Sequence, residues 1–429
     1  MLALPALPLE VPAGFSLRVC VRRSPLARLA PVAWLEPGEG AGAAARATGA
    51  LRLVLPPAGA GRSPLAPPVE VVLTQPGGAG TPLRVHGLAA EPAATGDPGA
   101  RRGQLERIAQ LERIAQLRDM LRLDEDYQLF YRLLGEDPEL GWAPALDAAR
   151  ALRSATAFED LVKCLLLGGA AEARAQALCA ALCALGAPTP SGARAFPQAP
   201  ELCAVSVEAL RELGLGRLAR PLHRLATLCA SGTLHAEALR RGPGHLAQAL
   251  AAAEDADDEA SWDDLVGEEL EWQERVRSLL EWLPGFGEQA VGEMQLLLGC
   301  YEDVQLHRRA RAAFGRRFPS RTRRRAARSG LAVTSRSEPA VANGADADRQ
   351  QAARHEEVLL IRRLLRRLEP YGLYRGLAQA LLTCERLGDG EAGAGSGGGG
   401  RREEAGEEAA GEEALADGAK ICPARGAAL

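Results

Sequence analysis

Apolar and polar residues alternate in four short runs near the start of the chain. The runs occupy residues 15–22, 51–55, 69–74 and 82–88, and segments rich in glycine and proline separate them. Alternation points every second side chain toward the same face of a strand, so each run predicts a half-buried strand. Together the runs predict a small antiparallel sheet whose connecting loops are flexible insertions.

After these runs, apolar residues recur every three or four positions, which is the spacing of one face of a helix. The sequence LERIAQ occupies 105–110 and again 111–116, a duplication that lengthens one helix by about one and two-thirds turns. One further helix begins near Phe158, and a short helix begins after Ser206, which caps it. A longer helix ends at Gly232. The pattern predicts a mainly α protein, with a helical core that follows a small N-terminal antiparallel β-sheet.

Two helical patterns flank the sequence LPGFG, which consists of Leu283, Pro284, Gly285, Phe286 and Gly287. Proline lacks an amide hydrogen and ends the first helix, while the glycines can adopt positive φ and leave no side chain above the turn. The arrangement predicts a helix-hairpin-helix motif, whose second helix binds a nucleic-acid phosphate through backbone amides without reading the base sequence. An ordinary corner between two helices is the alternative.

A strongly basic segment follows the hairpin. Residues 304–337 contain eleven arginines and no acidic residue, and Arg308, Arg309 and Arg311 stand nearest to the hairpin. Cations that displace counterions supply most of the nonspecific affinity for nucleic acid. The segment therefore strengthens the prediction of a DNA-binding surface, and the alternative is a solvated arginine-rich loop.

Composition divides the chain into five parts. They are predicted to be an N-terminal sheet domain with flexible loops (1–103), a helical core (104–315), a basic, disordered insertion (316–353), C-terminal helices that pack on the core (354–387) and a disordered acidic, glycine-rich tail (388–429). The tail holds nine acidic and four basic residues and so carries −5, whereas the whole chain carries −4. The rest of the chain is therefore weakly basic, which the overall charge hides.

The nine cysteines are scattered and odd in number, which predicts buried thiols in a reducing compartment. They form no CxxC pair and do not cluster after the hairpin as an iron–sulfur site would require, so no metal and no cofactor are predicted. No apolar run is long enough to cross a bilayer, and the N-terminus lacks the basic segment of a signal peptide. We therefore predict no membrane partner.

Four segments carry a resemblance to a known family, in the order in which that family has them. They are residues 158–167, 214–226, 283–301 and 369–382. The chain resembles the HhH-GPD superfamily of DNA glycosylases, which includes 3-methyladenine and 8-oxoguanine glycosylases, over residues 13–387. The resemblance implies a base-excision repair enzyme that binds double-stranded DNA through the hairpin, flips a damaged base into a cleft and hydrolyses its N-glycosidic bond.

The resemblance also implies a carboxylate that stabilises the oxocarbenium character of the transition state. The family's Asp position falls on His307, and an imidazole cannot take over that role. Gln289 stands where some members carry the lysine of a lyase, so a monofunctional enzyme without lyase activity is implied. Residues 169–172, GAAE, correspond to the block that fills the gap left by the flipped base, and lack the family's asparagine and aromatic residues.

These departures leave several interpretations open. Asp303 or Glu302, at the end of the second hairpin helix, could supply the carboxylate, or His307 could act by a different mechanism. Alternatively, the chain is a catalytically inactive DNA-binding member of the family. The duplicated LERIAQ and the repetitive tail also fit an incorrectly assembled gene. We expect a monomer in the nucleus, with an organelle as the alternative, and the sequence does not name the damaged base.

Overall fold

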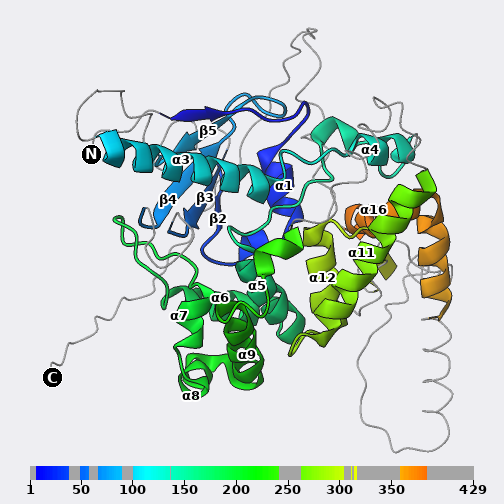
Figure 1. The fold of residues 1–429 in the computed structure, drawn as a ribbon. Coiled ribbons are helices and arrows are strands. Elements are labelled where there is room, and N and C mark those ends of the chain that lie inside the picture. The colour runs from blue at the N-terminus through cyan, green and yellow to red at the C-terminus, as the bar shows by residue number, and fades with distance from the viewer. Residues whose placement is uncertain are drawn as a thin grey trace, which may run out of the picture. The chain divides into compact units, whose positions relative to one another are not determined.

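The computed structural model describes residues 6–37, 49–57, 66–88, 100–135, 137–240, 262–303, 311, 314–315 and 358–383. These residues lie within one unit, Met1–Glu385. A five-stranded sheet with a helix across it forms one part of the unit, and a larger group of helices forms the other (Figure 1). The predicted insertion at 316–353 and the tail at 388–429 lie outside the described residues, so the predicted domain boundaries stay predictions.

The sheet is antiparallel throughout, and its strands lie in the order β1-β5-β4-β3-β2. The strands are β1 (Leu7–Leu9), β2 (Ala33–Leu35), β3 (Ala50–Leu55), β4 (Val69–Thr74) and β5 (Leu83–His86). Leu53 lies opposite Val71 and Leu73 lies opposite Val85, and all four side chains are buried. The last three alternating runs therefore form strands as predicted, because their apolar face meets a core.

The first alternating run forms a helix, so the predicted strand at 15–22 is wrong. Helix α1 spans Leu17–Arg23, and the hydroxyl of Ser16 accepts a hydrogen bond from an amide of its first turn. The buried residues include Cys20 and Val21, which are adjacent and cannot share one face of a strand. Over so short a run the helical and strand periods overlap, and the serine cap favours the helix.

Helix α3 (Ala100–Leu121) lies across the sheet and carries the duplicated sequence (Figure 1). Leu117 and Leu121 belong to the core that the helix shares with the sheet. Ile114 of the second copy packs on that core, whereas Ile108 at the same place in the first copy is 39% exposed. The duplication therefore rotates the first copy away from the sheet.

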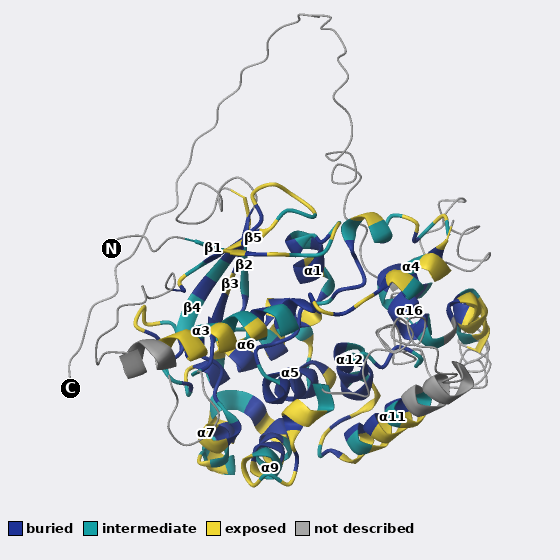
Figure 2. Ribbon diagram, turned by 45° about the horizontal axis from the view of Figure 1, so that its top comes forward, coloured by how far each residue is buried: buried dark blue, intermediate teal, exposed yellow. Residues whose placement is uncertain are grey.

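The helical part is built around α5 (Ala157–Gly169), which is buried along most of its length (Figure 2). The next helices are α6 (Glu172–Cys183), α7 (Ala199–Cys203), α8 (Val207–Leu210) and α9 (Ala219–Ala230). The hydroxyl of Ser206 accepts a hydrogen bond from the amide of Ala209 at 3.1 Å and caps α8. Gly232, with a φ of 76°, follows the end of α9. Both predicted helix ends are thus confirmed.

Two helices, α11 (Trp262–Trp282) and α12 (Glu288–Leu298), flank the hairpin turn, and α12 packs against α5. Helix α4 (Gln128–Leu134) and a 3-10 turn at Pro144–Leu146 lie between α3 and α5 in the chain. The C-terminal elements are a helix at 358–368, a 3-10 turn at Glu369–Tyr374 and α16 (Arg375–Thr383). None of the helices in the described ranges is long and apolar enough to cross a membrane.

The seven described cysteines are all free, and five of them are buried. Burial raises the pKa of Cys20 to about 12 and the pKa of Cys229 to about 11, so both remain thiols at neutral pH. Five of the seven described cysteines therefore match the predicted buried thiols, whereas Cys203 and Cys229 are half-buried. Within the same residues, no group of three or more His, Cys, Asp or Glu side chains is placed to hold a metal ion.

Candidate nucleic-acid interface and carboxylate site

The hairpin turn places its apolar side chains inward and its glycines at the surface. Leu283 and Phe286 belong to the core of the helical part and are 2% and 9% exposed. The amide of Phe286 donates to the carbonyl of Leu283 at 3.2 Å, which closes the turn. Gly285 and Gly287 are exposed. Two apolar residues therefore anchor a turn whose backbone faces solvent.

The two glycines of the turn differ in what surrounds them. Gly285 has a φ of 82°, and a Cβ atom there would lie 2.7 Å from Cβ of Pro221 and 2.9 Å from Cδ1 of Leu165. Both the backbone angle and the packing therefore favour glycine at this position. Gly287 has a φ of −97°, and no atom lies within 4 Å of a Cβ built on it. The surface over Gly287 is open.

Helix α12 begins at this open surface without a side-chain cap. Gly287 is its N-cap, and no carbonyl or side chain among the described residues accepts a hydrogen bond from the amides of Glu288 and Gln289. The side-chain Nε2 of Gln289 is buried and also lacks a partner in the described part of the chain. Unpartnered donors at a helix N-terminus can bind an anion such as phosphate.

Two buried arginines occupy the other end of α12. Arg122 Nη1 donates to the carbonyl of Leu296 at 3.0 Å, and Arg153 Nε donates to the carbonyl of Leu297 at 2.5 Å. Both guanidinium groups also pair with the carboxylate of Glu125, at 2.6 and 3.0 Å. Cations are favoured at a helix C-terminus and satisfy its last carbonyls. The C-terminus of α12 is thereby fixed to the segment that follows α3.

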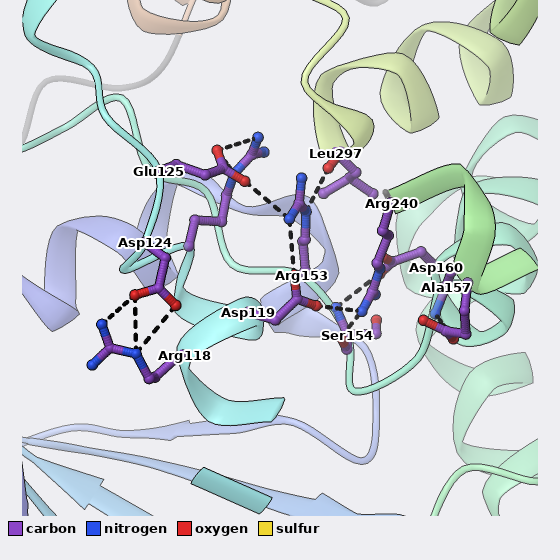
Figure 3. A network of polar contacts seen from close by, with 12 residues as sticks. Arg118, Asp119, Asp124, Glu125, Arg153, Ser154, Ala157, Asp160, Arg240 and Leu297 are labelled. Atoms are coloured by element: carbon purple, nitrogen blue, oxygen red, sulfur yellow. Dashed lines mark hydrogen bonds and ion pairs between the residues drawn. The ribbon is translucent and has the colours of Figure 1, made fainter. Parts of the chain in front are cut away.

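The same end of α12 belongs to a network of ion pairs that reaches α3 and α5 (Figure 3). Arg153 pairs with Asp119 of α3 at 3.1 Å, and Asp119 pairs with Arg240 at 2.7 Å. Arg240 in turn pairs with Asp160 of α5 at 2.5 Å. Burial alone would lower the pKa of Arg240, but Asp160 and Asp119 raise it above its ordinary value, so the guanidinium stays charged. The network therefore links the C-terminal end of α12 to α3, which lies on the sheet, and to α5 in the helical part.

Asp303 lies just after α12, and both of its carboxylate oxygens accept hydrogen bonds. Arg277 Nη1 donates to Oδ1 at 3.1 Å, and Gln295 Nε2 donates to Oδ2 at 2.6 Å. Arg277 belongs to α11 and Gln295 to α12, so both hairpin helices hold this carboxylate. The Asp303 side chain is nevertheless 36% exposed. The arrangement gives an oriented carboxylate that solvent can reach.

The C-terminal elements fix the backbone around Asp303. The amide of Gly376 donates to the carbonyl of Tyr301 at 2.7 Å, and a Cβ atom on Gly376 would lie 2.4 Å from the carbonyl oxygen of Asp303. Arg375 pairs with Glu302, the other carboxylate predicted for this place, at 2.8 Å. Glu302 thus joins the loop to α16, whereas Asp303 joins it to the two hairpin helices.

Several predicted site residues lie outside the described residues, namely His307, Arg308 and Arg309. Arg311 is described and partly buried. The block expected to fill the base gap lies at the end of α5, where a Cβ atom on Gly169 would lie 2.5 Å from Cδ2 of Leu218. The roles predicted for these residues in DNA binding and catalysis stay predictions.

Sequence reasoning missed four residues of this site: Arg122, Arg153, Arg277 and Gln295. Gln295 did carry a signal, because it is a polar residue on the apolar face of α12 and is only 3% exposed. A buried amide needs a hydrogen-bond partner, which here is Asp303. Arg122 carried no local signal, because it stands 174 residues before the carbonyl that it caps.

No protein-family model matches the chain, and a search of the curated proteins finds no match. Solved structures do match. The structure is similar to that of the 3-methyladenine DNA-glycosylase from Archaeoglobus fulgidus, with a TM-score of 0.51 and 15% identity over 88% of this chain and 97% of that chain. It is also similar to MBOgg1 in complex with a low affinity DNA ligand, with a TM-score of 0.48 and 16% identity over 88% of this chain and 96% of that chain.

A third similar structure is the apo-form of the 8-oxoguanine glycosylase/lyase from Clostridium acetobutylicum, with a TM-score of 0.48 and 12% identity over 90% of this chain and 100% of that chain. The match to the Archaeoglobus enzyme spans nearly the whole length of that enzyme and most of this chain. The sheet and the helical part together therefore have the fold of a DNA glycosylase, as the sequence resemblance predicts.

Proposed function

We propose that the chain is a DNA glycosylase of base-excision repair, which binds duplex DNA and hydrolyses the N-glycosidic bond of a damaged base. The observation that carries the proposal is the arrangement at α12, which has unpartnered amides at one end and Asp303 at the other. The helix has 11 residues, so the two ends are roughly 16 Å apart at about 1.5 Å per residue. One rigid element thus sets the distance between a phosphate contact and a carboxylate.

The hairpin turn binds a backbone phosphate in this proposal. Amides of Glu288 and Gln289 donate to phosphate oxygens, and the bare surface over Gly287 lets the DNA backbone approach. Leu283 and Phe286 hold the turn in place from the core. Contacts of this kind position the protein on the duplex without selecting a base sequence. Positive charge is added by three arginines that follow the hairpin in the sequence, namely Arg308, Arg309 and Arg311.

Asp303 carries out the chemistry in this proposal. A base flipped out of the duplex brings its deoxyribose toward the carboxylate, and extrusion costs less for a damaged, poorly paired base. As the bond to the base breaks, positive charge develops on the sugar, and the carboxylate stabilises it. Arg277 and Gln295 keep Asp303 oriented, and the exposed part of the carboxylate can direct a water molecule.

Gln289 defines the reaction type that we propose. A side-chain amide is not a nucleophilic amine and cannot form a Schiff base with the deoxyribose. The enzyme is therefore a monofunctional glycosylase that releases the base and leaves the DNA strand intact. It needs no cofactor, and we propose that it acts as a monomer in the nucleus.

Base release in single-turnover experiments tests the proposal. Duplexes that carry alkylated, oxidised or deaminated bases are mixed with excess protein, and the free base and the strand break are measured separately. We expect base release from at least one duplex, loss of release in Asp303→Asn, and no strand break. Glu302→Gln is the matched control, since it changes the neighbouring carboxylate, and it retains release.

A catalytically inactive DNA-binding protein is the second candidate function. The observation that favours it is that both oxygens of Asp303 already accept hydrogen bonds, from Arg277 and Gln295. In that case the carboxylate has only a structural role after α12. Salt-dependent binding to every duplex, with no base released by the wild-type protein from any of them, would establish this second function.

A further inference from the structure

Three exposed arginines lie beside the hairpin turn, and the proposed function does not use them. Arg217 belongs to a 3-10 turn at Gly216–Leu218, and Arg220 and Arg224 belong to the first half of α9. All three side chains are exposed. Neither Arg220 nor Arg224 forms an ion pair within the described residues, which leaves their charges without a partner there.

Several exposed arginines of the helical part outside α9 are paired. Arg211 pairs with Glu208 at 3.1 Å. On α11, Arg275 pairs with Glu271 at 3.4 Å, and Arg277 pairs with Glu281 at 3.0 Å. Paired charges cancel each other's field at a distance, so the surface of α11 attracts an anion less than the surface of α9 does. Of the two helices α9 and α11, α9 is thus the one whose exposed arginines are not balanced by an ion pair among the described residues.

The placement of Arg220 and Arg224 does not favour the stability of α9. The two residues stand four positions apart, so like charges face each other on one side of the helix. Arg220 also lies in the first turn, where the helix dipole disfavours a cation. Arg217 adds a third positive charge just before the helix. A bound anion would remove these unfavourable interactions.

The three arginines adjoin the open end of α12. A Cβ atom on Gly285 would lie 2.7 Å from Cβ of Pro221, the residue that follows Arg220. Arg217 Nη2 donates to the carbonyl of Gly169 at 3.0 Å, and a Cβ atom on the adjacent Gly168 would lie 2.9 Å from Cβ of Ala290 in α12. The arginines therefore follow the same edge of the helical part as the hairpin turn.

We propose that Arg217, Arg220 and Arg224 form a second phosphate-binding surface, which holds the backbone of the same DNA duplex next to the phosphate at the hairpin. The inference rests on the proposed DNA binding and extends it. Guanidinium groups bind phosphate oxygens well, and their contacts are independent of sequence. The arginines of α11 are paired, so the side of the hairpin formed by α9 attracts the duplex more strongly than the side formed by α11, and the arginines of α9 also set the direction of the duplex across the hairpin.

Salt-dependent binding tests this surface. The double variant Arg220→Gln/Arg224→Gln of the full chain is titrated with a fluorescent undamaged duplex at several salt concentrations. Each lost phosphate contact lowers the slope of log affinity against log salt by about 0.9 for B-form DNA. Arg211→Gln is the matched control, because it removes an exposed but paired arginine of the same part. Gly287→Asp provides a second comparison at the hairpin.

We expect the slope to fall by about 1.8 in the double variant and to stay unchanged in Arg211→Gln. Thermal unfolding shows that each variant is folded, and loss of two like charges on α9 leaves its midpoint unchanged or slightly higher. A wild-type slope in the double variant, with weaker binding by Gly287→Asp, would overturn the second surface but keep the proposed function. Absence of salt-dependent binding by the wild-type protein would overturn both.

Discussion

The two ends of α12 differ in how their backbone groups are satisfied. At the N-terminal end, Gly287 provides no cap and the amides of Glu288 and Gln289 have no partner in the described part of the chain. At the C-terminal end, the buried Arg122 and Arg153 donate to the carbonyls of the last turn. A helix normally has its ends capped by side chains or water. The difference fits the proposed function, in which one end binds a phosphate and the other is held rigid.

Rigidity at the closed end matters because Asp303 follows it directly. The carboxylate is held by Gln295 within α12 and by Arg277 from α11. Catalytic groups must be held within a fraction of an ångström of their working position, which requires supporting contacts of this kind. The open end cannot have supporting contacts of this kind, because a side chain in the space over Gly287 would exclude the proposed DNA phosphate. In the proposed function, the same helix thus binds a phosphate at one end and positions Asp303 at the other.

Breaking the closed end has the largest expected effect. Arg153→Met removes the donor to the carbonyl of Leu297 and takes one ion-pair partner from each of Glu125 and Asp119. We expect the free energy of unfolding to fall by about 3–5 kcal/mol, as for other buried ion pairs that lose one partner. Urea unfolding followed by circular dichroism measures the change.

The matched control for Arg153 is Arg118→Gln, which removes an arginine that pairs with Asp124 at the surface. Exposed pairs contribute less than about 1 kcal/mol, so this variant should unfold almost as the wild type does. Similar small losses in both variants would show that the buried network does not hold α12.

Gly285→Ala tests the packing of the turn and should have an intermediate effect. A positive φ and close contacts with Pro221 and Leu165 both oppose a side chain there. We expect the free energy of unfolding to fall by about 1–3 kcal/mol. Gly78→Ala is a suitable control, because Gly78 has a φ of 81° but no atom within 4 Å of its Cβ position. If both variants lose the same amount, the packing at Gly285 contributes nothing beyond its backbone angle.

Gly287→Asp tests the open end and should have the smallest effect on stability. Aspartate is a favoured N-cap, so the free energy of unfolding should be unchanged or rise by a few tenths of a kcal/mol. Its carboxylate repels phosphate, and we expect DNA affinity to fall at least tenfold, or about 1.4 kcal/mol. Gly287→Asn caps the helix without charge and should lose less affinity. Equal DNA binding by all three proteins would contradict a phosphate site at this end.

The sequence predicts the open end of α12 better than the closed end, for a physical reason. Pro284, Gly285 and Gly287 act on their own backbone, so their effect can be predicted from a few neighbouring residues. The caps at Ser206 and Gly232 were predicted for the same reason. Helix α1 shows the limit of local reasoning. Its seven residues fit both the period of a helix and that of a strand, and only the cap at Ser16 favours the helix.

The closed end depends on contacts between residues far apart in the chain. Arg122 and Arg153 stand in segments before α5, yet they cap carbonyls of α12. In an arginine-rich sequence, no local pattern distinguishes a buried arginine from a solvated one. The unpaired state of Arg220 and Arg224 could not be predicted either, because it depends on where acidic residues of other helices lie. Tertiary structure thus decides which arginines stabilise the fold and which remain free to bind.

Single-turnover base release as a function of protein concentration tests most directly whether one end of α12 binds DNA and the other positions Asp303. We expect Gly287→Asp to raise the protein concentration needed for the half-maximal rate and to leave the rate constant at saturation close to that of the wild type. Asp303→Asn should leave that concentration unchanged and lower the saturating rate constant by at least about 100-fold. A saturating rate constant for Asp303→Asn equal to that of the wild type would contradict the account.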